Sequence, residues 1–241
     1  MKLTIQEIHR ISETTNMIPT DIASILEVGC GDGRISNIIN KKYNVTSIDI
    51  NQTKIQEVSA KKIIADISNL PIKNDTYDLV ISAEVIEHLD DDTFDKALKE
   101  MVRVCKKYIL ISVPFKENIP AQWKKCSGCG HIFHQWGHVR KFDCNALETL
   151  FNGAHLDKKV YLSPKETRIP PFFYVCARII GGVWGSKEEV PRLCPECGSP
   201  AVKNEGNIIG KFFTRFIWKM DKMRIAEKPI WICGLYKKMC L

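Results

Sequence analysis

Short apolar runs and segments of helical periodicity alternate along the first half of the chain. The runs are rich in β-branched residues, as buried strands are, and they span residues 24–28, 45–50, 62–65, 77–83 and 108–114. Between them, apolar residues recur every three or four positions, most regularly over 93–105. Strands that alternate with helices form a parallel sheet covered on both faces. The pattern predicts an α/β fold with a doubly wound, mostly parallel sheet.

Further elements are expected outside these strands. Four isoleucines have helical spacing and predict a leading amphipathic helix: Ile5, Ile8, Ile11 and Ile18. Other helices are expected at 35–40, 53–60 and 143–151, and two more strands at 158–163 and 230–236. The sheet is therefore expected to contain seven strands.

The first strand ends in an acid and a glycine-rich loop: Glu27, Gly29, Cys30, Gly31, Asp32 and Gly33. Glycines permit a tight turn and let backbone N–H groups approach a ligand. The spacing Gly-x-Gly-x-Gly resembles the loop of class I S-adenosylmethionine (SAM)-dependent methyltransferases of the type 11/12 kind. The third glycine comes one residue earlier than in the dinucleotide fingerprint, which disfavours an NAD-dependent reductase.

The resemblance covers residues 24–115 closely and implies how SAM, or its product S-adenosylhomocysteine, is bound. Asp49, at the end of the second strand, corresponds to the acid that holds the ribose hydroxyls, with Ile50 beside it. Asp66 and Ile67 correspond to the contacts with the adenine amine and ring. Glu84, after the fourth strand, is expected at the methionine end of SAM.

Three residues are candidates for the chemistry. His88 is the best proton acceptor by type because its reference pKa is close to neutrality. Glu87 stands next to it, and His134 lies in a histidine-rich segment after the fifth strand. The pattern Glu84-x-x-Glu87-His88 also resembles a magnesium-binding pattern of small-RNA 2′-O-methyltransferases. The pattern is also widespread among methyltransferases without a catalytic metal, and the alternative is an acid that begins a helix beside a structural histidine.

Two Cys-x-x-Cys-Gly sequences predict a structural zinc site with the ligands Cys126, Cys129, Cys194 and Cys197. Both pairs are expected to leave the carboxyl end of the sheet, because one follows the fifth strand and the other precedes an antiparallel last strand. Two unrelated dithiols, or a site in which His131 or His134 replaces one cysteine, are the alternatives. We expect a methyltransferase core at 1–163 and 229–241, and a zinc-stapled substrate cap at 116–140 and 164–228.

Charge is concentrated near the C-terminus. The net charge is +7, and residues 201–241 hold nine Lys/Arg and three acids, a balance of +6. Residues 208–222 predict a basic amphipathic helix, which suits packing on the zinc module, peripheral membrane contact or RNA phosphates. No run is long enough to span a bilayer, and the first residues do not form a signal peptide, so a cytoplasmic protein is expected.

The sequence thus predicts a SAM-dependent methyltransferase that methylates oxygen on a small-molecule, glycan or lipid-linked acceptor. One alternative is a metal-dependent RNA 2′-O-methyltransferase. The non-enzyme alternative is a SAM-binding scaffold whose zinc module recruits a partner. The acceptor and the oligomeric state are not encoded in any pattern that we can interpret.

Overall fold

The computed structural model describes residues 4–184, 192–202, 206–224 and 227–239. Parts of the predicted second insertion, at 185–191, 203–205 and 225–226, therefore lie outside the described residues. The chain forms two compact units. The first comprises residues 1–116, 142–164 and 229–241, and the second comprises 117–141 and 165–228.

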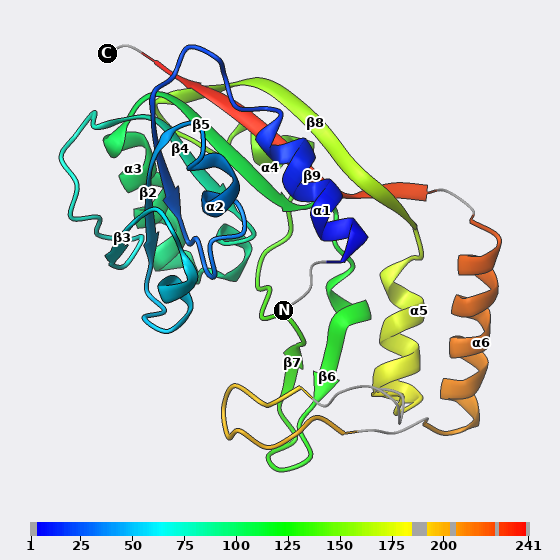
Figure 1. Cartoon of the computed structure of the whole chain (residues 1–241). Helices are drawn as coiled ribbons and strands as arrows, with labels where there is room; N and C mark the ends of the chain where they lie inside the picture. The colour runs from blue at the N-terminus through cyan, green and yellow to red at the C-terminus, as the bar shows by residue number, and fades with distance from the viewer. Residues whose placement is uncertain (1–3, 185–191, 203–205, 225–226, 240–241) are drawn as a thin grey trace. The chain divides into compact units, whose positions relative to one another are not determined.

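A seven-stranded sheet forms the centre of the first unit, with the order β3-β2-β1-β4-β5-β9-β8 (Figure 1). Its strands are β1 (Ser24–Val28), β2 (Asn44–Asp49), β3 (Lys61–Ile64), β4 (Tyr77–Ala83), β5 (Cys105–Pro114), β8 (Ala154–Thr167) and β9 (Glu227–Lys238). Strands β1 to β5 pair in parallel, and β9 runs antiparallel to β5. The predicted Rossmann-like α/β fold is confirmed.

Alternating strand residues enter two separate cores, one on each face of the sheet. In β4, Val80 packs with Met101 of α3 (Asp91–Val104), and Leu147 of α4 (Cys144–Glu148) lies in the same core. Leu79 and Ile81 face the other core, where α1 (Ile5–Thr15) and α2 (Ser36–Ile39) lie. Burial of both faces explains why the central strands are apolar without alternation.

The helices differ from the predictions more than the strands do. The predicted leading helix forms and buries Ile11 together with Arg10 and Thr14. Ile5 and Ile8 are exposed, so the isoleucine spacing identified its buried face only in part. The helix expected at 53–60 is a single 3₁₀ turn, Lys54–Glu57. Ile55 supplies its buried contact.

The second unit contains a short antiparallel ribbon and a helical hairpin. Strand β6 (Trp123–Lys125) pairs with β7 (Ile132–His134), and Cys126 at the end of β6 bridges to Ala201. The hairpin consists of α5 (Pro171–Val175), which continues as a π-helical turn at Cys176–Ile180, and α6 (Ile208–Lys222).

Candidate active site

The glycine-rich loop of the first unit has a backbone that side chains would disrupt. Gly29 has φ +72°, and a Cβ atom there would lie 2.3 Å from Val85. Gly31, at φ +55°, donates its N–H to Asp49 Oδ2 over 2.7 Å. The loop after β1 is thereby fastened to the end of β2, which brings these two predicted cofactor residues together. Gly33 serves packing instead, since its Cβ would meet Val58 at 2.8 Å.

A cleft of about 460 Å³ opens beyond the carboxyl ends of β1, β2 and β4. Seven of the residues predicted to bind the cofactor line it: Gly29, Gly31, Asp49, Ile50, Asp66, Ile67 and Glu84. Asp49 Oδ1 accepts the N–H of Asn51, and Asn51 in turn caps the following 3₁₀ turn. Ile50 is 70% exposed, which leaves an apolar surface for a ring system.

A second cleft, of about 470 Å³, shares Gly29, Gly31, Lys54 and Glu84 with the first. Arg10 lines it and is only 8% exposed, and among the described residues its Nε has no hydrogen-bond partner. Its Nη1 lies 3.6 Å from Glu84 Oε1. Trp231 of β9 donates its indole N–H to the other carboxylate oxygen of Glu84 over 2.9 Å.

The leading helix is tied to the glycine-rich loop by charge. Arg34 contacts Glu7 of α1 and bonds Asp32 at 3.0 Å. Thr4 caps α1 and donates its backbone N–H to Glu7, which lowers the pKa of that carboxyl below its usual range, and Arg34 acts in the same direction. Asp32 and Arg34 both line the second cleft, so their ion pair forms part of its wall.

Glu27 lies at the floor of the second cleft and is 3% exposed. Its carboxylate accepts the hydroxyl of Ser36, which also contacts Ser47 at 2.6 Å. Burial raises the pKa of Glu27 to about 7, although the hydrogen bonds with Ser36 oppose this shift. Cys30, also from the predicted set, lines the same cleft.

The segment after β4 is not a regular helix. Glu84, Glu87 and His88 therefore do not share one helical face, as a magnesium site built from these three residues would require. Glu84 has φ +58° and precedes a short 3₁₀ turn, Ile86–His88. The ligand atoms of the three residues do not all lie within 4.8 Å of one another. Glu87 is fully buried, whereas His88 is exposed and lines the first cleft. The strained backbone directs Glu84 toward Arg10 and Trp231 instead.

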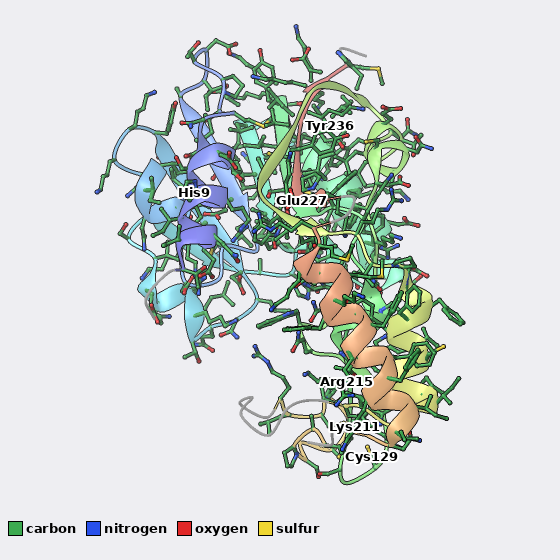
Figure 2. All side chains as sticks on the ribbon, turned by 90° about the vertical axis from the view of Figure 1, so that its right-hand side faces the viewer. His9, Cys129, Lys211, Arg215, Glu227 and Tyr236 are labelled. Atoms are coloured by element: carbon green, nitrogen blue, oxygen red, sulfur yellow. The ribbon has the colours of Figure 1, made fainter. Side chains whose placement is uncertain are left out.

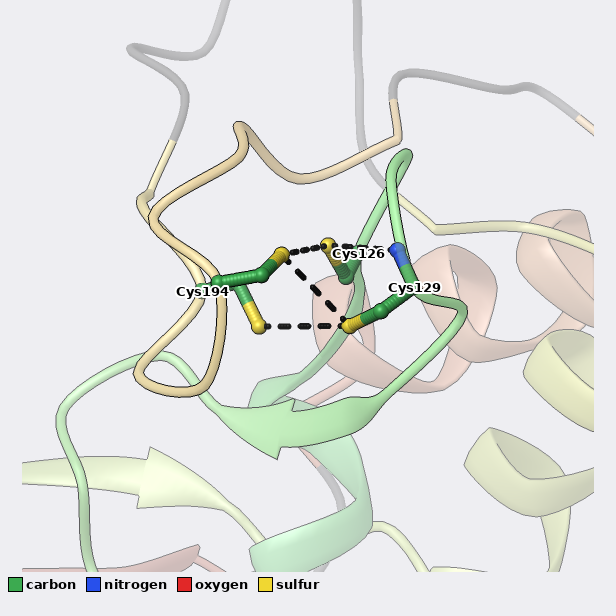
Figure 3. Close-up of side chains that lie close together, drawn as sticks. Cys126, Cys129 and Cys194 are labelled. Carbon is green, nitrogen blue, oxygen red and sulfur yellow. Dashed lines mark hydrogen bonds between the residues drawn. The ribbon is translucent and has the colours of Figure 1, made fainter.

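In the second unit the four predicted cysteines converge (Figure 3). The sulfur of Cys126 lies 3.4 Å from that of Cys197, and Cys129 lies 3.8 Å from Cys194. Sulfurs around a tetrahedral zinc, at Zn–S of about 2.3 Å, are about 3.8 Å apart. The backbone N–H groups of residues 128 and 129 point at Cys126 Sγ over 3.3 and 3.4 Å, as suits a thiolate. The donor set and spacing therefore fit zinc.

His134 belongs to a buried polar cluster with Glu117 and His138. Its Nδ1 accepts the backbone N–H groups of Trp136 and His138, so its proton resides on Nε2, 3.4 Å from Glu117 Oε1. His138 Nδ1 lies 2.6 Å from Glu117 Oε2. Burial alone would raise the pKa of Glu117, but the two histidines outweigh it and lower that pKa to about 2. In this arrangement two backbone N–H groups occupy the Nδ1 lone pair of His134, and its Nε2 faces Glu117.

Sequence reasoning missed Arg10, Trp231 and Glu117. Arg10 is an isolated cation in a helix whose apolar spacing points elsewhere, and Trp231 is 147 residues from its partner Glu84. Only the tertiary fold brings them together. Glu117 had one available signal, its position directly after the fifth strand, where ligand-binding side chains gather.

Comparison with known proteins identifies the domain. Residues 26–110 match a family described as "Methyltransferase domain". Residues 26–110 are therefore similar to a methyltransferase domain. The matched residues extend from β1 into β5, so the methyltransferase domain includes the glycine-rich loop, Asp49 and the end of β4.

Relatives with similar sequences match parts of this chain. An uncharacterized protein of Methanocaldococcus jannaschii is 31% identical over 156 residues, which cover 61% of this chain and 62% of that protein. Norajmaline N-methyltransferase of Rauvolfia serpentina is 31% identical over 94 residues, 34% of this chain and 32% of the enzyme. The chain thus matches under two thirds of the length of each.

Solved structures share the fold of the methyltransferase domain. The N-methyltransferase NodS of Bradyrhizobium japonicum, in complex with S-adenosylhomocysteine, has a TM-score of 0.55 at 12% identity and covers 98% of this chain and 88% of its own. At this identity the likeness concerns the fold alone.

Proposed function

We propose that the chain transfers a methyl group from SAM to an acceptor, with SAM bound across the two clefts of the first unit. The observation that carries this proposal is the hydrogen bond from the N–H of Gly31, which lines both clefts, to Asp49, which lines the first. Asp49 retains carboxylate lone pairs for the ribose hydroxyls. Asp66 suits the exocyclic amine of adenine, and exposed Ile50 and half-buried Ile67 suit the ring.

Arg10 and Glu84 complement the two charges of a free amino acid. SAM ends in a carboxylate and an ammonium group, and the second cleft presents a buried guanidinium beside a carboxylate. We assign the carboxylate to Arg10, whose buried Nε lacks a partner among the described residues. The ammonium group is assigned to Glu84, which Trp231 orients. Charge-assisted hydrogen bonds of this type are the strong ones.

SAM supplies, when bound, a methyl group on a positively charged sulfur. The residues of the chain must then align the acceptor and remove its proton. We assign proton removal to His88, which lies exposed in the first cleft, and the positioning of the turn that carries it to buried Glu87. We favour an oxygen acceptor on a small molecule or glycan. An amine, as in the name of the plant relative, requires the same proton removal.

We further propose that Cys126, Cys129, Cys194 and Cys197 hold one structural zinc ion. A set of four thiolates, to which the described residues add no further ligand, is typical of structural sites. Zinc binding requires these cysteines in the thiolate form. We assign acceptor selection to the second unit, whose buried Glu117–His134–His138 cluster fixes the segment after β7.

Transfer of a labelled methyl group from SAM tests the proposal. The purified protein is incubated with an extract that is then divided into RNA, lipid and small-molecule fractions. Label in one fraction, lost with Asp49→Ala, is the expected result and identifies the acceptor class. Binding of SAM without label in any fraction would favour the scaffold alternative, and label in RNA would favour the nucleic-acid alternative.

A further inference from the structure

The helical hairpin of the second unit exposes an aromatic surface. Five phenylalanines pack on one another between α5 and α6, and we call them the aromatic face: Phe172, Phe173, Phe212, Phe213 and Phe216. Phe172 is 64% exposed and Phe212 is 65% exposed. Ile208, Ile209 and Met223 extend the exposed apolar area. An aromatic cluster that is packed inside but uncovered outside marks an interaction surface.

This surface is preformed, because the two helices are fastened at their adjoining ends. The backbones meet at glycines, since a Cβ on Gly181 would lie 2.2 Å from Gly210 Cα. Asn207 caps α6 and also donates its backbone N–H to the Gly181 carbonyl over 2.8 Å and its side-chain amide to Ile180 O over 3.1 Å. The aromatic face therefore needs no rearrangement to meet a partner.

A row of cations borders the aromatic face along α6, and we call it the cationic edge: Lys211, Arg215, Lys219 and Lys222. Figure 2 labels Lys211 and Arg215 on this helix. Asp221 is the one acid within α6, and in the described part of the chain none of the four cations pairs with a carboxylate. Unpaired cations of one sign suit an anionic partner.

The positions of these side chains around α6 fit a flat, water-facing boundary. At 3.6 residues per turn, the cationic edge spans an arc of about 80°, between Trp218 on one side and Phe212 on the other. Trp218 is 59% exposed, and Lys222 Nζ lies 3.9 Å above its ring. Helices that lie on a membrane typically insert aromatic rings into the headgroup region, and their long basic side chains reach the phosphates.

We propose that the aromatic face and the cationic edge of the α5/α6 hairpin bind the surface of an anionic lipid bilayer. A contact between two copies through the same face would bring their cationic edges together, which is unfavourable. RNA phosphates would use the cations but would leave Ile208 and Met223 without a role. In the described ranges no helix is long and apolar enough to cross a membrane, so the proposal concerns attachment to its surface. It stands on the second unit alone and does not depend on methyl transfer.

Flotation of the full-length, zinc-supplemented protein with vesicles tests the proposal. The vesicles are phosphatidylcholine alone, or phosphatidylcholine with a quarter phosphatidylglycerol. We expect binding to the anionic vesicles only, weakened at least about tenfold between about 0.1 and 0.5 M salt. Phe212→Ser and the pair Lys211→Glu with Arg215→Glu should each reduce binding at least about tenfold.

A matched control has the same charge change elsewhere. Lys96→Glu with Lys99→Glu, on exposed positions of α3, should leave binding within about twofold of the wild type. Trp emission should shift to shorter wavelength with anionic vesicles, and Trp218→Phe should reduce the shift. The proposal would be overturned if the control pair lost as much vesicle binding as the α6 pair. It would also be overturned if the wild type bound neutral and anionic vesicles equally, or if the folded protein bound neither. So would a dimer abolished by Phe212→Ser, or single-stranded RNA bound through the same residues in place of lipid.

Discussion

At the scale of single residues, Asp49 connects the fold to its ligand. Its two oxygens accept backbone N–H groups from the glycine-rich loop and from Asn51, so the carboxylate is fixed before any ligand arrives. Arg10 and Glu84 hold a similar position at the second cleft. Polar groups fixed in advance lose little entropy on binding, which raises affinity.

Replacement of Arg10 with methionine should weaken SAM binding selectively. Loss of a charge-assisted hydrogen bond to the ligand carboxylate costs about 2 kcal/mol, or about 30-fold in Kd. 5′-Methylthioadenosine lacks the amino-acid end, so its Kd should change less than about twofold. Titration calorimetry with both ligands measures the difference. An equal loss for both ligands would contradict the role assigned to Arg10.

Glu27 should make stability fall as pH rises. Its folded pKa of about 7 lies above the ordinary 4.5, so between these values the unfolded chain loses a proton that the folded chain keeps. Folding is therefore penalised increasingly from pH 4.5 to 7, by about 3 kcal/mol when complete. The glutamine of Glu27→Gln does not titrate, so urea titrations across this range should show the free energy of unfolding of the wild type falling relative to that of this variant as pH rises. A constant difference would refute the burial of a protonated Glu27.

Asp49 and Asp66 were predictable as cleft residues because each acid directly follows a strand, and strand ends determine where a ligand binds. Arg10 could not be predicted in this way. It lies on the buried face of α1 with Ile11 and Thr14, and this face becomes recognisable only when the packing of the helix on the sheet is known. Glu84 was predicted at the site, but its positive φ was not, because the sequence there is compatible with a regular helix.

At the scale of elements, strands were predicted better than helices. Runs such as Tyr77–Ala83 are buried on both faces, so their composition alone is decisive. The segment around Ile55 buries one side chain and needs only one 3₁₀ turn. The sequence at 53–60 has the periodicity of a longer helix, but the length of a helix depends on how much of it packs against the rest of the protein.

The cysteine cluster should organise the second unit by binding zinc. We expect one zinc per chain by metal analysis, because the four sulfurs already have tetrahedral spacing. Cys129→Ser should lower zinc content and the thermal stability of the second unit, whereas Cys144→Ser, outside the cluster, should retain both. A zinc content unaffected by Cys129→Ser would show that the cysteines do not share an ion.

The contact between α5 and α6 should tolerate no side chain at Gly210. A Cβ there would lie 2.5 Å from the Gly181 carbonyl oxygen, which belongs to the backbone and cannot move aside alone. We expect Gly210→Ala to destabilise the second unit by about 1–3 kcal/mol despite the better helix propensity of alanine. Lys211→Ala, exposed on the same helix, should change stability by less than about 0.5 kcal/mol. Tryptophan fluorescence during denaturation measures both, and equal effects would show that the helices are not packed at these glycines.

At the scale of the whole molecule, two units divide the work that we propose. The first contains the methyltransferase domain and both clefts, and the second contains the cysteine cluster and the helical hairpin. The paired Cys-x-x-Cys-Gly spacing made the convergence of four cysteines predictable over a long separation. The acceptor was not predictable, because its contacts depend on side chains from loops that share no pattern.

Calorimetric titration with S-adenosylhomocysteine measures cofactor binding by the first unit directly, because the product complex needs no acceptor. We expect micromolar binding by the wild type and a loss of about 10- to 100-fold with Asp49→Ala, which removes charge-assisted hydrogen bonds to the ribose. NAD should produce no binding heat. A folded protein that does not bind S-adenosylhomocysteine, or that binds NAD through Asp49 instead, would contradict the account.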